Sequence, residues 1–314
     1  MFNDIFVGVM MVVALVVGFA MLVKGADWFV EGAAGIASKF GIPQLVVGLT
    51  IVAMGTSAPE AAVSITAALK GTADIAVGNV VGSNILNVLV ILGLTGLITS
   101  VAVQKSTLFI EIPYMLVVTG VLLGMGMLGN SINLTEGIIL WAMFILYLAY
   151  LFVLAKKGKA EEEEKEERPL WKLLLFALIG GVVVVWGSNI AVDSATAIAQ
   201  IIGLSEKFIG LTIVALGTSL PELVTSVTAA RKGNADIAIG NIVGSNIFNI
   251  LFVLGTSALI IPITFEASFA IDTIIAIAAG VLLWIATIGK KKLTRPWGII
   301  MLLCYAAYFV YLLV

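Results

Sequence analysis

The chain has 314 residues, of which 61% are hydrophobic and 11% are charged, and its formal net charge is −2. Soluble domains carry about 25% charged and about 45–50% apolar residues, so this composition excludes a soluble globular protein and indicates an integral membrane protein. The chain has no histidine and one cysteine, Cys304. This excludes a histidine-ligated zinc or haem centre, a serine–histidine catalytic site and an intrachain disulfide.

The predicted elements are helices that cross a membrane. A spanning helix needs about 20 apolar residues, and ten segments of the chain meet this requirement. They are residues 5–23, 43–69, 73–98, 108–128, 134–155, 171–190, 207–230, 235–260, 267–288 and 297–313. The first segment has no positively charged flank before it and no obvious cleavage site, so we expect it to be a retained helix and not a signal peptide.

A charged segment divides these ten helices into five and five. Residues 156–168 read KKGKAEEEEKEER, a composition that cannot bury itself and is typical of a solvated linker. The predicted organisation is therefore a first five-helix repeat over residues 1–155, a charged linker over 156–169 and a second five-helix repeat over 170–314.

The two halves are related by an internal repeat. A shift of 162 residues aligns Leu49–Ile98 with Leu211–Ile260 without a gap, and 33 of these 50 positions are identical. Because each half holds an odd number of crossings, the second half must enter the membrane from the opposite side. The predicted fold is an all-α integral membrane protein with two inverted-topology repeats, an arrangement typical of secondary transporters.

Lysine and arginine are unevenly distributed between the two sides of this predicted fold. Lys70 and Lys207 lie on the side of the termini, and the other fifteen basic residues lie on the opposite side. The positive-inside rule then predicts a cytoplasmic linker and extracellular termini. We expect the protein to lie in the plasma membrane.

The second predicted helix of each half contains a break. The sequence GTSAPE at Gly55–Glu60 is matched by GTSLPE at Gly217–Glu222. Proline cannot donate a backbone hydrogen bond, so Pro59 and Pro221 each leave the carbonyl four residues earlier without its helical partner. Irregular backbone survives inside a membrane only where it is buried in protein or lines a cavity. Both second helices are therefore predicted to be broken, with free carbonyls that a bound cation could satisfy.

Glu60 and Glu222 lie well inside their predicted spans, where a carboxylate costs at least about 2.5 kcal/mol. No lysine or arginine lies at similar depth in another span. The expected counter-charges are therefore metal ions or protons. Asp27 and Asp193 flank the first helix of each half and are expected to be solvated or interfacial.

The third predicted helix of each half carries a polar stripe with a four-residue spacing, which places its members on one face. The stripes are Asn79, Ser83 and Asn87 in the first half and Asn241, Ser245 and Asn249 in the second. Hydrogen bonding between helices is the alternative interpretation, and we favour it for Asn79 and Asn241, which lie nearest the helix starts. Asn84 and Asn246 are expected to point elsewhere.

Carboxylates, hydroxyls, amides and free carbonyls make up a donor set that contains oxygen and neither sulfur nor imidazole. Such a set selects hard cations, such as calcium and sodium, over zinc or copper. Two carboxylates neutralise one divalent ion or balance two monovalent ions. Calcium and sodium could therefore compete for the same oxygens, as an exchanger requires.

At these residues the chain resembles the sodium/calcium exchanger branch of the cation/calcium exchanger superfamily. The paired motifs G-T-S-x-P-E and G-N-x-x-G-S-N-x-x-N are similar to the two alpha repeats of that family. The resemblance implies antiport of calcium against sodium by alternating access, without a cofactor. The expected partners are the calcium and sodium ions and the lipid bilayer, with no nucleic acid and no obligate protein partner.

The resemblance also implies a set of metal ligands. The carboxylates are Glu60 and Glu222, the hydroxyls are Ser57, Ser83, Ser219 and Ser245, the backbone carbonyls are Ala53, Thr56, Ala215 and Thr218, and the amide is Asn87. Several members of the family, including potassium-dependent ones, have an aspartate where this chain has the candidate ligand Asn249. With one ionisable oxygen fewer, potassium coupling is not implied.

Three alternatives compete with a sodium/calcium antiporter. A proton/calcium antiporter would use Glu60 and Glu222 to bind protons. An ion channel is disfavoured, because channels usually build a symmetric ring around a pore. An intramembrane enzyme has no evident catalytic residues in this sequence, so we expect a secondary active transporter and not an enzyme.

Overall fold

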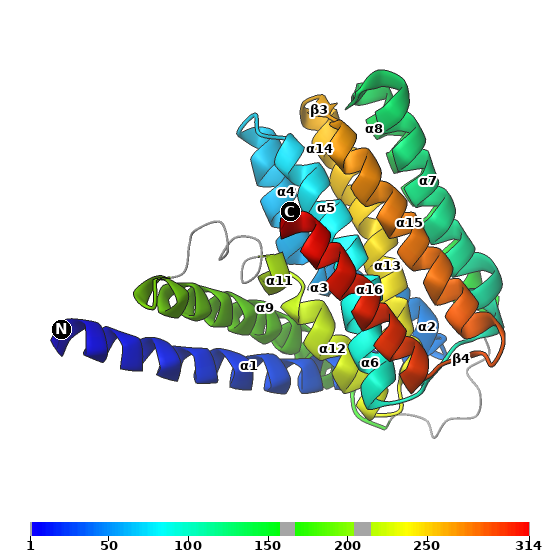
Figure 1. Ribbon diagram of the computed structural model, residues 1–314. Helices are drawn as coiled ribbons and strands as arrows, with labels where there is room; N and C mark the ends of the chain where they lie inside the picture. The colour runs from blue at the N-terminus through cyan, green and yellow to red at the C-terminus, as the bar shows by residue number, and fades with distance from the viewer. Residues whose placement is uncertain (1, 158–166, 204–214, 314) are drawn as a thin grey trace.

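The computed structural model describes residues 2–157, 167–203 and 215–313 (Figure 1). Within these ranges the protein is built almost entirely of helices. Four of the segments, labelled η, are π-helical turns inserted into or joined to α-helices.

After the first helix, the elements of the first half follow the predicted spans closely. In chain order they are α1 (Phe2–Phe40), α2 (Gln44–Val47), η1 (Gly48–Val52), α3 (Ala53–Thr56), α4 (Ala58–Leu69), α5 (Asp74–Leu86), η2 (Asn87–Leu92), α6 (Gly93–Ile98), β1 (Val101–Ala102), η3 (Thr107–Glu111), α7 (Ile112–Gly129), β2 (Ser131–Ile132) and α8 (Leu134–Lys157).

The second half repeats this order. Its described elements are α9 (Leu170–Ile201), α11 (Ala215–Gly217), α12 (Leu220–Arg231), α13 (Ala235–Phe248), η5 (Asn249–Leu254), α14 (Gly255–Ile260), β3 (Ile263–Thr264), α15 (Ala267–Ile288), β4 (Lys292–Leu293) and α16 (Arg295–Leu313).

The described residues contain eight helices that are long and apolar enough to cross a membrane, or nine if the bent pair Gln44–Thr56 and Ala58–Leu69 forms one span. The protein is therefore a multi-pass membrane protein. Part of the predicted span 207–230 and most of the predicted linker lie outside the described residues. A total of ten spans accordingly stays a prediction.

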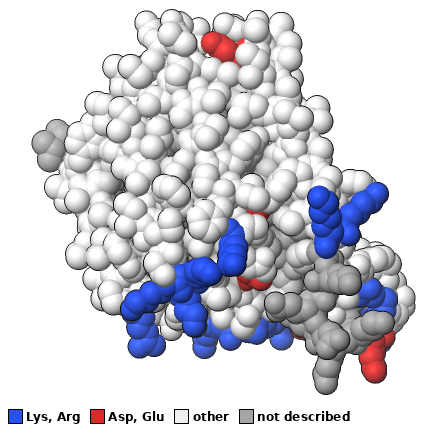
Figure 2. All heavy atoms as spheres, turned by 90° about the vertical axis from the view of Figure 1, so that its right-hand side faces the viewer, with Lys and Arg blue, Asp and Glu red and all other residues white. Residues whose placement is uncertain are grey.

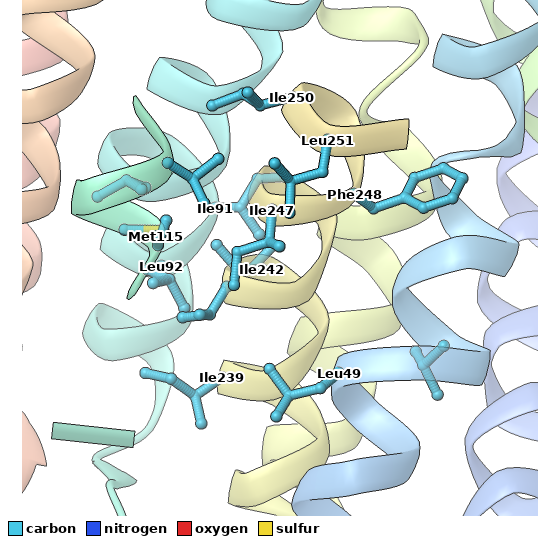
Figure 3. Close-up of a cluster of buried hydrophobic side chains, with 14 of the residues drawn as sticks. Leu49, Ile91, Leu92, Met115, Ile239, Ile242, Ile247, Phe248, Ile250 and Leu251 are labelled. Carbon is cyan, nitrogen blue, oxygen red and sulfur yellow. The ribbon is translucent and has the colours of Figure 1, made fainter. Parts of the chain in front are cut away.

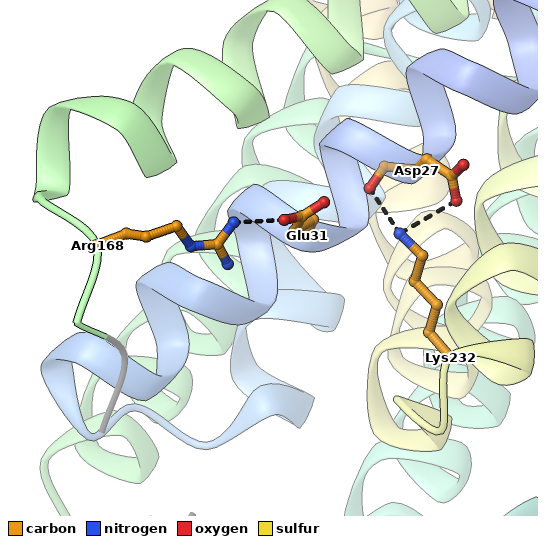
Figure 4. Close-up of polar contacts among 4 residues, drawn as sticks. All are labelled: Asp27, Glu31, Arg168 and Lys232. Carbon is orange, nitrogen blue, oxygen red and sulfur yellow. Dashed lines mark hydrogen bonds and ion pairs between the residues drawn. The ribbon is translucent and has the colours of Figure 1, made fainter. Parts of the chain in front are cut away.

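The predicted ends of the first helix of each half, at residues 23 and 190, are wrong, because α1 continues to Phe40 and α9 to Ile201. Charged residues do not stop α1, since two of them have partners in distant parts of the chain (Figure 4). Lys232 Nζ lies 3.1 Å from Asp27 Oδ1, and Arg168 pairs with Glu31.

Both long helices end instead at matched glycines. Gly41 and Gly203, which are 162 residues apart, have φ of +62° and +83°. This left-handed conformation favours glycine and is a common helix terminator.

α1 and α9 form a close antiparallel pair that is set apart from the upright bundle in Figure 1. Glycines allow the two backbones to approach. A Cβ built at Gly25 would lie 2.8 Å from the backbone nitrogen of Val184, and one at Gly180 would lie 2.4 Å from that of Phe29. Small residues at such contacts are typical of helix packing in lipid.

The core of the protein is centred on α13 and η5, which are buried along almost their whole length. Figure 3 shows Ile242, Ile247 and Leu251 of this rod packed among apolar side chains from both halves, including Leu49 and Leu92. Two antiparallel strand pairs, β1 with β4 and β2 with β3, also join the halves. An all-helical prediction did not include these two-residue strands.

Candidate ion-binding site

The predicted helix break is present in the first half and recurs in the second. α3 ends at Thr56 and α4 begins at Ala58, with a bend of 51° between the two segments of this span. Ser57 sits at the break with φ −82° and ψ 9°, and Ser219 has nearly the same conformation, φ −92° and ψ 5°, before α12. The two serines therefore occupy equivalent breaks, each followed by proline at the second helical position.

The carbonyl freed by the second proline has found a partner in α9. Ser188 Oγ donates to the Gly217 carbonyl oxygen at 2.8 Å, and Gly217 precedes Pro221 by four residues. The position equivalent to Ser188 in the first half is Ala26, which has no hydroxyl. The two breaks thus have similar backbone conformations, but the position in α1 that matches Ser188 has no hydroxyl that could donate to the freed carbonyl.

The two glutamates are buried in the first turns of α4 and α12, with exposed fractions of 1% for Glu60 and 0% for Glu222. Each is held by a serine of the other half. Ser57 Oγ donates to Glu222 Oε1 at 2.7 Å, and Ser219 Oγ donates to Glu60 Oε1 at 3.2 Å. The second carboxylate oxygen, Oε2, is buried and without a hydrogen-bond partner in both residues.

Asn79 and Asn241 fasten each glutamate-bearing helix to the helix that follows it. Asn79 Nδ2 donates to the Glu60 carbonyl oxygen at 3.2 Å and to Ser64 Oγ at 2.9 Å. Asn241 Nδ2 makes the matching bonds in the second half, at 3.4 Å to the glutamate carbonyl and 2.9 Å to a serine. These bonds confirm the interhelical interpretation of both asparagines.

Four asparagines form a hydrogen-bonded network where the two third helices meet. Asn84 and Asn246 each donate from Nδ2 to the other's backbone carbonyl oxygen at 3.1 Å. Asn87 Nδ2 donates to Asn246 Oδ1 at 3.0 Å, and Asn249 Nδ2 donates to Asn84 Oδ1 at 3.2 Å. The expectation that Asn84 and Asn246 point away from the stripe residues is therefore wrong.

This error has a physical reason. A four-residue spacing identifies neighbours on one helix, whereas the asparagine network joins two helices that are 162 residues apart in sequence. Within this network Asn87 and Asn249 donate from Nδ2, and their Oδ1 atoms remain buried and without a hydrogen-bond partner.

The Ala53 carbonyl, a predicted ion ligand, already accepts hydrogen bonds. The donors are the Ser57 backbone nitrogen at 3.0 Å, Thr56 Oγ1 at 3.3 Å and Ser245 Oγ at 3.4 Å. This oxygen therefore lies where the first break, its threonine and the third helix of the second half meet.

The remaining candidates surround the same breaks. Thr56 Oγ1 also donates to Asn241 Oδ1 at 2.9 Å, which ties the first break to the second half. Ser83 is buried on α5, which packs against α11, the segment that begins at Ala215. Thr218 is half-buried in the turn between α11 and α12.

Two π-helical turns at the site were not predicted. η2 begins at Asn87 and η5 at Asn249. π-turns inside α-helices are rare and occur frequently at functional sites. No compositional signal in the sequence marks them.

Four of the buried oxygens without partners in the described chain belong to these glutamates and asparagines, namely Glu60 Oε2, Glu222 Oε2, Asn87 Oδ1 and Asn249 Oδ1. They come from elements that pack across the halves, since α12 contacts η2 and α4 contacts η5. Neither glutamate forms an ion pair with a basic residue of the described chain. Such oxygens suit hard cations.

Comparison with known proteins agrees with this chemistry. The family model described as sodium/calcium exchanger protein matches residues 10–153 and 172–314. The putative antiporter CaxA of Alkalimonas amylolytica is 39% identical over 94% of this chain and 96% of its own length. The sodium/calcium exchanger MaX1 of Methanosarcina acetivorans is 32% identical over 95% of this chain and 97% of its own.

A solved structure of the sodium-calcium exchanger NCX_Mj, soaked with sodium and without calcium, has a similar fold. It superposes with a TM-score of 0.84 and 31% sequence identity, covering 96% of this chain and 99% of its own. Sequence and fold thus agree over almost the whole chain, and this multi-pass membrane protein belongs to the sodium/calcium exchanger family of transporters.

Proposed function

We propose that the protein is a secondary active antiporter that exchanges Ca²⁺ for Na⁺ across the membrane, at a site between the two halves of the chain. The observation that carries this proposal is the set of four buried, unpartnered oxygens on Glu60, Glu222, Asn87 and Asn249. An unpaired buried carboxylate is strongly unfavourable. A bound cation removes that penalty by accepting these oxygens as ligands.

The proposed ligand set is wider than these four residues. It also contains the hydroxyls and carbonyls next to the helix breaks and on the third helices. These are Ser57, Ser219, Ser83, Ser245, Thr56, Thr218, Ala53 and Ala215. A serine hydroxyl that donates its hydrogen to a carboxylate keeps its lone pairs, so Ser57 and Ser219 can bind an ion while they hold the glutamates.

Charge balance limits the exchange. Two glutamates neutralise one Ca²⁺ or two Na⁺, and Asn249 contributes no charge. Exchange of more than two sodium ions per calcium would therefore move net charge, and each charge is worth about 2.3 kcal/mol per 100 mV. Because Asn249 carries no charge, it also supports a transport cycle that does not involve potassium.

Alternating access follows from the proposed membrane topology. An odd number of crossings in each half would place the repeats in opposite orientations around the ions. Most basic side chains visible in Figure 2 gather at one end of the molecule, which supports a cytoplasmic position for that end and extracellular termini. The plasma membrane is the proposed location.

Proton coupling is the second candidate function. The two glutamates could each carry a proton in place of sodium, and the serine and asparagine ligands are the feature that favours sodium. Sodium requires several oxygen ligands around it, whereas a proton requires one acceptor.

Purified protein in sodium-loaded liposomes tests the proposal. Dilution into sodium-free medium should drive calcium uptake, and an equal choline gradient should not. Uptake that ignores the sodium gradient and follows an imposed pH gradient would replace sodium by protons as the coupling ion. Uptake that follows neither gradient would remove antiport as the function.

A further inference from the structure

A third carboxylate, Glu111, is buried away from the two helix breaks. It ends η3 with an exposed fraction of 0%, and its Oε1 accepts a hydrogen bond from Tyr150 of α8. At the 162-residue shift, the equivalent position is Thr273. Glu111 therefore does not belong to the duplicated motif, and the proposed exchange of ions does not use it.

Three oxygens around Glu111 are buried and without a hydrogen-bond partner, namely Glu111 Oε2, Thr107 Oγ1 and Tyr147 OH. Thr107 and Glu111 are four residues apart on η3. Tyr147 and Tyr150 are three apart on α8 and so share a face of that helix. The three oxygens thus come from two facing elements.

Aromatic packing holds α7, the helix that continues from η3, against α8. The Tyr114 and Tyr147 rings stack at 5.5 Å between centroids, and Tyr114 OH donates to the Met143 carbonyl oxygen at 3.0 Å. α15 also packs against η3, where the Trp284 indole donates to the Leu108 carbonyl oxygen at 2.8 Å. The three unpartnered oxygens therefore lie where η3 meets α7, α8 and α15.

Among the residues that the structure describes, no positive side chain balances Glu111. In the described chain it forms no ion pair, and the ionisable groups around it are the hydroxyls of Tyr114, Tyr147 and Tyr150. A buried carboxylate without a counter-charge is strongly unfavourable. One positive charge, held by oxygens, would remove this penalty.

Glu111 lies near the end of the bundle that carries the charged linker. Its partner Tyr150 precedes Lys156, near the end of α8, by six residues, which is about 9 Å along a helix at about 1.5 Å per residue. Lys156 and Lys157 begin the charged linker segment. The carboxylate therefore lies a short way inside the bundle, on the side of the linker.

We propose that Glu111, Thr107 and Tyr147 bind one monovalent cation, H⁺ or Na⁺, at a site separate from that of Glu60 and Glu222. Glu111 supplies the charge and one oxygen, and the two hydroxyls supply the others. Tyr150 is a positioning residue, because it fixes the carboxylate through Oε1 and leaves Oε2 for the ion.

Two measurements on the full-length protein distinguish the occupants. Both use a Glu60→Gln, Glu222→Gln background, which removes the two other deeply buried carboxylates that we assign to ions. Infrared spectra taken across a pH series without sodium detect a protonated carboxylic acid. Thermal unfolding across a sodium series, with choline keeping the ionic strength constant, detects sodium binding through the rise in Tm that a ligand of the folded state produces.

If the occupant is a proton, the carboxylic acid band should vanish in Glu111→Gln and shift in Tyr147→Phe. If it is sodium, the rise in Tm should vanish in Glu111→Gln. Tyr147→Phe removes one unpartnered hydroxyl and keeps the packed ring, so it should require about three- to tenfold more sodium for the same rise. Glu266→Gln, which changes an exposed acid, should leave both signals unchanged.

Either signal, if retained in Glu111→Gln, would overturn the assignment to Glu111, and a signal that is lost in Glu111→Gln but unchanged in Tyr147→Phe would remove Tyr147 from the site. The absence of both signals in the background protein would also overturn it, since Glu111 would then bind neither a proton nor sodium. Because the background lacks the two main carboxylates, these results do not depend on whether calcium exchange is coupled to sodium.

Discussion

At the scale of single residues, several side chains of the site both form hydrogen bonds across the two halves and keep an oxygen without a partner. Each glutamate has one oxygen held by a serine of the other half and one without a partner. Asn87 and Asn249 each donate from Nδ2 to an asparagine of the opposite half, and their Oδ1 atoms have no partner. The same side chains that join the two halves therefore also present oxygens to the space between them.

Removal of one charge at this site should stop calcium transport. We expect Glu60→Gln or Glu222→Gln to reduce sodium-dependent calcium uptake at least about 100-fold, because two carboxylates are needed to neutralise a divalent ion and a buried charge pair is worth several kcal/mol. Uptake into proteoliposomes measures this loss. Asp193→Asn, on the exposed surface of α9, is the control. A glutamine variant with normal uptake would remove that carboxylate from the site.

Addition of a charge should act in the opposite direction. Asn249→Asp loses the hydrogen bond to Asn84, which is worth about 1 kcal/mol. It gains attraction to a bound cation of about 3 kcal/mol per unit charge at about 5 Å, for an effective dielectric constant of about 20. The gain exceeds the loss, so the calcium concentration for half-maximal uptake should fall about tenfold or more.

Asn87→Asp provides the matched comparison, because its Oδ1 is also unpartnered and its amide donates to the opposite half. Both variants should tighten calcium binding in equilibrium titrations of the purified protein. A half-saturation concentration that rises in both would place the added charges away from the ion.

At the scale of helices, the close pair α1 and α9 depends on glycine. A methyl group at Gly180 would lie 2.4 Å from a backbone nitrogen of α1, whereas one at Gly124 of α7 meets nothing within 4 Å. Gly180→Ala should therefore destabilise the protein by about 1–3 kcal/mol, as overpacking does. Gly124→Ala should be neutral or stabilise it by about 0.5–1 kcal/mol.

Thermal unfolding of the two alanine variants in the same detergent measures this difference. The substitution is identical in both, so any effect of alanine on helix propensity cancels between them. Equal Tm values would show that α1 and α9 can separate at Gly180 without loss, which would contradict the packing of the pair.

The elements also show how far the sequence could be interpreted. The apolar runs and the 162-residue repeat predict the helices and the break before Glu60 and Glu222, because these depend on local chemistry. The continuation of α1 past residue 23 was missed, since Asp27 and Glu31 are tolerated through partners as distant as Lys232. The asparagine network was missed for the same reason, since it depends on how helices of different halves pack.

At the scale of the whole molecule, the two strand pairs and the asparagine network each join one half to the other. The halves therefore form one body around the breaks, except that α1 and α9 stand beside it as a pair (Figure 1). A transport cycle in which the site opens to each side in turn requires the two repeats to face opposite sides of the membrane.

Cysteine labelling tests this topology directly. Cys304→Ser gives a cysteine-free protein, into which single cysteines are placed at Leu69 and Arg231. These residues end α4 and α12, are 162 residues apart and are both exposed. In intact bacterial cells that express the protein, a membrane-impermeant maleimide should label Leu69→Cys. It should label Arg231→Cys only after the cells are permeabilised, because the surplus of basic residues predicts a cytoplasmic position.

Arg295→Cys, at the start of α16, lies on the predicted cytoplasmic side and should behave like Arg231→Cys. If Leu69→Cys and Arg231→Cys react from the same side, the two repeats share one orientation, and the proposed alternating access between inverted halves is wrong. If they react from opposite sides with Leu69→Cys inside, the repeats are inverted and the positive-inside assignment alone is reversed. Sodium-driven calcium uptake would remain possible in that second case, since exchange depends on the inversion of the halves and not on which side each one faces.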